Sequence, residues 1–167
     1  GPLAAGLKDA AALIKGGLPV RVMALDSTGW DTHSDETKRL SACAASLSGS
    51  LDAFWKDLGA AERSRTVVLV MTEFGRTAAE NGSKGTDHGA GSAMFALGGR
   101  LRGGRVVTRW PGIGPSDLNQ GRDLKVTTDF RDVFAEVLEK HMGLSPAQQK
   151  DIFPGHTVSP TNYPGLF

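Results

Sequence analysis

The residues best suited to chemistry lie in three short polar segments, each beside an apolar run of the chain. The segments read GWDTHSDE, TEFGR and GTDHG, and their reactive side chains are Asp31, His33, Glu73, Arg76, Asp87 and His88. Imidazole nitrogens and carboxylate oxygens suit Zn²⁺, Mn²⁺ and similar ions. A planar guanidinium suits a tetrahedral anion. These residue types indicate a divalent metal centre with Arg76 as an anion clamp.

A metal centre of this kind would do a recognisable class of chemistry. A divalent ion can polarise a phosphoryl or sulfuryl oxygen and activate a nucleophile. Zn²⁺ or Mn²⁺ is the expected ion, and the expected substrate is a small anionic ester. The candidate donors are two histidines and three carboxylates, which are His33, His88, Asp31, Glu73 and Asp87.

Each polar segment also has a purely structural interpretation. GWDTHSDE could cap the helix that follows it, with Ser34 or Asp35 as the N-cap residue. Asp87 and His88 could be a solvated turn with a histidine bonded to the backbone. Glu73 is harder to explain in this way, because a carboxylate at the end of a buried strand is costly unless Arg76 or a cation pairs with it.

The spacing of apolar residues, together with cap and turn residues, predicts the helices and strands that position these segments. Apolar residues at helical spacing predict helices over 3–15, about 36–58, and from Thr128 as N-cap to a C-cap at Gly143. Apolar runs predict strands at VRVMAL, TVVLVMT, AMFALGG and RVVTRW, with TVVLVMT a central strand covered on both faces. The sequence therefore predicts an α/β fold, with a partly parallel sheet and helices on its faces.

This predicted sheet explains how distant segments could meet. GWDTH follows VRVMAL, TEFGR follows TVVLVM, and GTDHG precedes AMFAL. Ligands of such sheets bind beyond the carboxyl ends of the strands. We expect the three segments to converge at one rim of the sheet.

Composition limits the classes of partner. The chain has 167 residues, 40% apolar and 22% charged, with a formal net charge of +1. We expect one α/β domain with an extended tail over 145–167. A net charge this close to zero does not indicate a surface that binds nucleic acid, which needs clustered Lys and Arg side chains. No apolar run reaches the roughly 18 residues of a membrane span. Cys43 is the single cysteine, so any metal needs histidine and carboxylate ligands.

Several motifs in order resemble one bacterial family. They are GWDTHSDE, then TVVLVMTEFGRTAAENGSKGTDHGAGSAMFALGG, then DLKVTTDFRDVFAEVLEKHMGL. They resemble the carboxyl-terminal half of the family catalogued as domain of unknown function 1501, whose members are similar to the alkaline phosphatase and sulfatase superfamily. The resemblance implies that the chain is a single domain or a fragment of a larger alkaline-phosphatase-like domain, with a periplasmic or extracellular location.

The resemblance also implies a set of ligands. Asp31, His33 and His88 would hold one ion, with Asp87 beside them as a ligand or an orienting group. The strand that ends in TEFGR resembles one that usually ends in an Asp-His pair of ligands. Glu73 stands in that place, so it would contribute to a second, weaker site. Asp26 is a reserve ligand.

The superfamily's nucleophile and an early metal-binding aspartate would precede Gly1 in this resemblance. The leading hypothesis is therefore a metal-dependent hydrolase of phosphate or sulfate esters that is incomplete in this chain. Its partner would be the missing amino-terminal half or a second copy of the chain. A second hypothesis is a non-catalytic metal- or glycan-binding envelope protein that retains the fold. A third is a partner subunit whose Asp and His side chains serve only caps and turns.

Overall fold

The computed structural model describes residues 1–167, and the chain folds as a mixture of helices and short strands. It divides into two compact units. Unit 1 comprises residues 1–64 and 77–88, and unit 2 comprises residues 65–76 and 89–167. The chain therefore passes from one unit to the other after residues 64, 76 and 88. Residues 77–88 belong to unit 1, although they lie in the sequence between the two stretches of unit 2.

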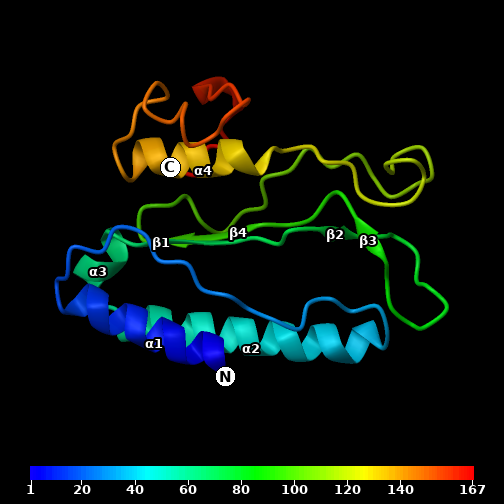
Figure 1. Cartoon of the computed structure of the whole chain (residues 1–167), viewed down its shortest axis with the longest axis horizontal. Helices are drawn as coiled ribbons and strands as arrows, with labels where there is room; N and C mark the ends of the chain where they lie inside the picture. The colour runs from blue at the N-terminus through cyan, green and yellow to red at the C-terminus, as the bar shows by residue number, and fades with distance from the viewer. The chain divides into compact units, whose positions relative to one another are not determined.

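Unit 1 is built on two long helices that lie side by side (Figure 1). They are α1 (Pro2–Lys15) and α2 (Glu36–Asp57), and the short α3 (Ala60–Ser64) follows them. Their buried apolar side chains are Leu7, Ala10, Ala11, Phe54 and Leu58. Two alanines on α1 let the helices approach closely, and an ion pair of 2.7 Å joins Lys15 to Asp57. The sequence predicted both long helices correctly.

The strands form two small antiparallel sheets. In the first, β1 (Val67–Val70) pairs with β4 (Phe95–Gly98), so that Val67 faces Gly98 and Val70 faces Phe95. The second consists of two-residue strands, β2 (Gly75–Arg76) and β3 (His88–Gly89). The overall α/β character is confirmed. The predicted parallel sheet is wrong, because every strand pair with an assigned direction is antiparallel.

The predicted strand at VRVMAL is also wrong, and so is the one at RVVTRW. Residues 18–32 and 104–110 run without any strand. Val22 and Val106 are 71% and 88% exposed. TVVLVMT is not a central strand either, since β1 pairs with one strand only and its residues are half-buried. An apolar run reports a preference for burial, whereas a strand also needs a neighbour that supplies its backbone hydrogen bonds.

Unit 2 is organised around α4 (Phe130–Lys140), whose buried apolar residues are Val133, Ala135 and Val137. The tail after α4 includes a 3-10 turn, η1 (Pro160–Asn162). This tail returns to the helix rather than lying loose. The Tyr163 hydroxyl donates to Glu139 Oε2 at 2.8 Å, and the Gly165 N–H donates to the buried Glu136 at 2.8 Å. None of the helices combines the length and apolar character that crossing a membrane requires.

The start of α4 differs by one residue from the prediction. Asp129, and not Thr128, is the N-cap residue, and its side chain accepts a hydrogen bond from the Arg131 N–H at 2.9 Å. The Arg131 guanidinium bonds the same carboxylate at 2.6 Å. The pKa of Asp129 falls to about 2, mainly because of the side-chain hydrogen bond from Arg131. The helix ends at Lys140 with His141 as the C-cap residue, two residues before the predicted Gly143.

Candidate metal centre

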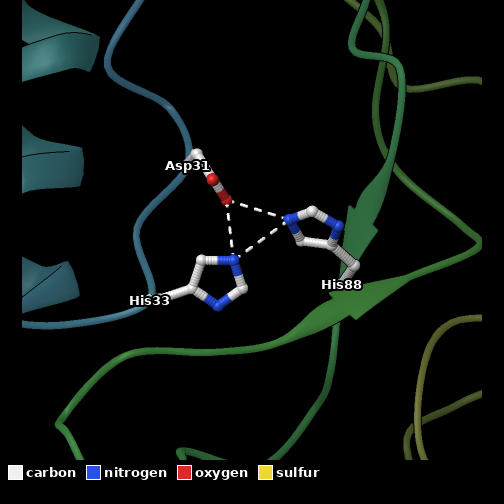
Figure 2. A group of neighbouring side chains, drawn as sticks. All are labelled: Asp31, His33 and His88. Carbon is white, nitrogen blue, oxygen red and sulfur yellow. Dashed lines mark hydrogen bonds and ion pairs between the residues drawn. The ribbon is translucent and has the colours of Figure 1, made fainter.

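Three of the predicted donors meet in unit 1. Asp31 Oδ1 lies 2.9 Å from Nε2 of both His33 and His88, and the two Nε2 atoms are 3.2 Å apart. Figure 2 shows the three side chains turned toward one another, from the loop before α2 and from β3. The three atoms therefore form a nearly equilateral triangle with one potential ligand atom at each corner.

This triangle fits a small divalent ion. Ligands about 2.0–2.1 Å from a tetrahedral Zn²⁺ are separated from each other by roughly 3.3 Å. The observed separations of 2.9–3.2 Å are slightly shorter. An ion about 1 Å above the plane of the triangle would reach all three atoms. The fourth tetrahedral position would then face away from the triangle.

The second ring nitrogen of His33 has its own partner. His33 Nδ1 lies 3.3 Å from Asp87 Oδ1. The carboxylate cannot donate, so the Nδ1–H must be the donor of this bond. If an ion binds between the three donor atoms, this tautomer would offer it the lone pair of Nε2. Asp87 would therefore act on a bound ion through His33, in the way that carboxylates commonly orient histidine ligands of zinc.

Asn81 holds this arrangement together, and sequence reasoning missed it. Its Nδ2 donates to the His33 carbonyl at 3.1 Å and to Asp87 Oδ1 at 3.2 Å. Its Oδ1 accepts from the N–H groups of Ser83 and Gly85 at 2.9 and 3.1 Å. The pKa of the Asp87 carboxyl lies below its ordinary value, first because of the hydrogen bond from Asn81 and then because of the bond from His33. The Asn81-Gly82 pair, a common turn signal, could have drawn attention to it.

Backbone hydrogen bonds dock the loop of residues 77–88 onto the start of α2. The Thr86 N–H donates to the Thr32 carbonyl at 3.3 Å, and the N–H groups of Asp35 and Glu36 donate to the carbonyls of Ser83 and Lys84 at 3.2 and 2.8 Å. These contacts replace the predicted helix cap. Asp35 stands at the N-cap position with φ at +47°, but its side chain makes no capping bond. The helix start is satisfied by the loop instead, and this brings His88 to His33.

Close packing at Gly85 depends on the absence of a side chain. A Cβ at this position would lie 2.2 Å from the carbonyl carbon of His33 and 2.5 Å from the Ser34 nitrogen. Both are backbone atoms, so neither can move aside by changing a rotamer. The residue is buried. Glycine here sets how closely the loop approaches the residue that carries the His33 ring.

The remaining predicted site residues have other surroundings. Glu73 belongs to unit 2, where its side chain is exposed. The expectation of a costly buried carboxylate at the end of a strand was therefore wrong. The Arg76 guanidinium, also in unit 2, lies over the Phe74 ring at 5.0 Å. Asp26 is exposed in unit 1 and outside the triangle.

Comparison with known proteins gives one match. Residues 11–153 match the family described as "Protein of unknown function (DUF1501)". No curated protein and no solved structure shows significant similarity to the chain.

Proposed function

Because the chain belongs to the family described as protein of unknown function (DUF1501), we propose its function from the chemistry of the site. The proposal is a metal-dependent hydrolase of phosphate or sulfate esters, with Asp31, His33 and His88 as the ligands of a Zn²⁺ or Mn²⁺ ion. The triangle of donor atoms carries it. When bound, such an ion would act as a Lewis acid on an ester oxygen.

Charge and proton placement support an anionic substrate. The donor set combines one carboxylate with two imidazoles that bind metals in the neutral form. A divalent centre would then retain a net charge of about +1, which attracts an anionic ester. Asp87 accepts the Nδ1–H of His33 at 3.3 Å, and this hydrogen bond would orient the ring with Nε2 toward a bound ion.

The motif order supports the finer parts of the proposal. The order of GWDTH, TEFGR and GTDHG resembles that of the carboxyl-terminal half of an alkaline-phosphatase-like domain. In this proposal Arg76 is the anion clamp, and Glu73 is a donor to a second, weaker site. The nucleophile would come from a preceding part of that domain.

Solvent exposure favours a second candidate function, metal binding without turnover. The side chains of Asp31, His33 and His88 are 59%, 48% and 49% exposed. A hydrolytic centre gains from excluding water, which strengthens its electrostatic interactions. An envelope protein that binds an ion or a glycan has no such need.

Metal titration of the purified chain tests the metal centre. The protein is stripped with chelator and titrated with Zn²⁺ and Mn²⁺ by calorimetry, and bound metal is then counted by elemental mass spectrometry. We expect one tightly bound ion per chain, lost in both His33→Ala and His88→Ala. His141→Asn removes a histidine from unit 2 and should leave the stoichiometry at one. A chain that binds no ion contradicts the proposal, as does equal binding by His33→Ala.

Turnover separates the two candidate functions. The metal-loaded protein is assayed with 4-nitrophenyl phosphate and 4-nitrocatechol sulfate. Hydrolysis that is lost in His33→Ala supports the hydrolase. One tightly bound ion without turnover of either ester supports the binding protein.

A further inference from the structure

A cavity of about 420 Å³ lies wholly within unit 2. Three stretches of chain line it: residues 107–109, residues 127–132 around the start of α4, and residues 162–164 at the end of η1. None of these residues belongs to the candidate metal centre. The cavity lies in the size range of sites for small organic molecules, about 300–1,000 Å³.

The lining is rich in groups that make no hydrogen bond within the protein. Those groups are the hydroxyls of Thr108, Thr127 and Thr128, the side-chain amide of Asn162 and the guanidinium of Arg109. Each hydroxyl offers one donor and two acceptor lone pairs, and the amide offers both kinds of group. Water can satisfy these groups in the free protein, so a ligand that displaces it needs several groups that both donate and accept.

The charges of the cavity exclude a strongly ionic ligand. Asp129 is held by Arg131 at 2.6 Å, and the buried Asp132 is held by His156 Nε2 at 2.8 Å. Each carboxylate therefore already has a hydrogen-bonded partner, which leaves a cation little to bind. Arg109 is the one charged side chain of the lining without an ion pair, and a single exposed guanidinium attracts an anion only weakly in water. The site suits a ligand that is neutral and polar.

Part of the cavity lining is apolar. Tyr163, Pro164 and Val107 contribute this part. The Tyr163 hydroxyl is engaged with Glu139 at 2.8 Å, which fixes the position of the ring. A fixed aromatic ring gives a flat apolar surface beside the polar groups. A ligand with one polar edge and one apolar face would match both the polar and the apolar residues of the lining.

We propose that this cavity binds a neutral saccharide of one or two sugar rings. Ring hydroxyls both donate and accept, so they match the threonines, Asn162 and Arg109. The C–H face of a sugar ring matches Tyr163 and Pro164. This site is independent of the metal centre and of any ester hydrolysis.

Nuclear magnetic resonance tests the proposal on the intact chain. The ¹⁵N-labelled protein is titrated with glucose, N-acetylglucosamine and maltose at millimolar concentrations, and with inorganic phosphate in parallel. We expect at least one sugar to shift amides of residues 107–109, 127–132 and 162–164. Thr128→Val and Asn162→Ala should each weaken binding about fivefold, the effect of one lost hydrogen bond. The control Thr28→Val replaces an exposed threonine of unit 1 and should bind as the unaltered chain does.

Three outcomes would overturn the proposal. One is the absence of shifts with every sugar, which makes the cavity a water-filled hollow. Another is binding of phosphate without binding of sugar, which makes it an anion site. The third is sugar binding that Thr128→Val and Asn162→Ala leave unchanged while their spectra show a folded protein. The titration of the unaltered chain does not depend on how the variants fold, and the metal stoichiometry of Asn162→Ala should remain that of the unaltered chain.

Discussion

His33 is the residue through which most of the site's interactions pass, because both of its ring nitrogens and its carbonyl are engaged. Nε2 faces Asp31 and His88, Nδ1 bonds Asp87, and the carbonyl accepts from Asn81. A histidine constrained at three points has little rotamer freedom left to lose when a metal binds. Preorganisation of this kind raises affinity without adding a ligand.

Asp87→Asn should weaken metal binding about tenfold, at the low end of the range for a group that orients a metal ligand. The amide oxygen can still accept the Nδ1–H of His33, but it no longer carries the charge that makes the imidazole a stronger ligand. The measurement is a competition titration against a chelator of known affinity. Asp35→Asn is the control, since that exposed carboxylate makes no capping bond and no contact with His33. An unchanged affinity in Asp87→Asn would show that Asp87 has no orienting role.

The sequence predicted the donors but not what supports them. Asp31, His33 and His88 stand out because few other side chains bind divalent ions. Asn81 and Gly85 do not stand out, because polar and glycine residues fill many loops. Their importance depends on a backbone approach of the 77–88 loop to residues 32–36. The residue types alone do not encode that approach.

At the scale of elements, the loop of residues 77–88 acts as a clasp on α2. Its base is closed by a bond from the Thr77 N–H to the Asp87 carbonyl at 2.9 Å, with a return bond from the Asp87 N–H to Thr77 Oγ1 at 3.2 Å. Its tip bonds the first two amides of the helix region. The clasp and the helix start therefore position the three candidate donors, in place of the sheet rim expected from the sequence.

Gly85→Ala should open this clasp. The added methyl group must displace backbone at His33, and overpacking of this sort costs about 1–3 kcal/mol. Metal affinity should fall with it, because His33 moves. Gly82→Ala is a matched control in the same loop, since a Cβ there meets nothing within 4 Å. Urea denaturation and metal titration of both variants measure the two effects, and equal behaviour of the two variants would contradict the clasp.

The cap of α4 gives a prediction that depends on pH. The folded pKa of Asp129, about 2, lies below its ordinary value of 3.8. The ionised carboxylate therefore stabilises the fold fully above pH 3.8, and this contribution is lost as the pH falls through about 2. Asp129→Asn keeps an N-cap side chain but loses the charged pair with Arg131. The stability difference from the unaltered chain should be constant near neutral pH and vanish toward pH 2 in urea titrations. A difference that persists at pH 2 would contradict the role of the charge.

Helices were predicted better than strands for a physical reason. The bonds of a helix are local, so the spacing of Leu7, Ala11 and similar residues contains most of the information needed. A strand needs a partner that is distant in sequence. β1 and β4 found each other, with Leu69 opposite Ala96. VRVMAL pairs with no other strand. Its own six residues contain no information on whether such a strand is present.

At the scale of the molecule, the division into two units means that an ion at the proposed site should stabilise unit 1 and not unit 2. All three donors belong to unit 1. An ion that binds the folded state stabilises it by mass action. That stabilisation acts first on the amides that the clasp bonds, at Asp35, Glu36 and Thr86.

Hydrogen exchange with and without Zn²⁺ should therefore respond unequally along the chain. We expect slower exchange at residues 32–36 and 83–88, because opening of the clasp must release the ion. Residues 130–140 of α4 should exchange at the same rate in both conditions. His88→Ala should abolish the difference. Equal protection of α4 and the clasp would mean that the two units unfold together.

The interrupted course of unit 1 also has a consequence for the order of events during synthesis. His88 follows His33 by 55 residues, and a ribosome adding about 5–20 residues per second needs roughly 3–11 s to cover that interval. During that time the nascent chain has Asp31 and His33 but not the third donor. Release from the ribosome of residues 65–76, which belong to unit 2, must also precede completion of the triangle. If the proposed ion binds, its capture by all three donors would therefore be a late step, which could begin only after part of the second unit has emerged.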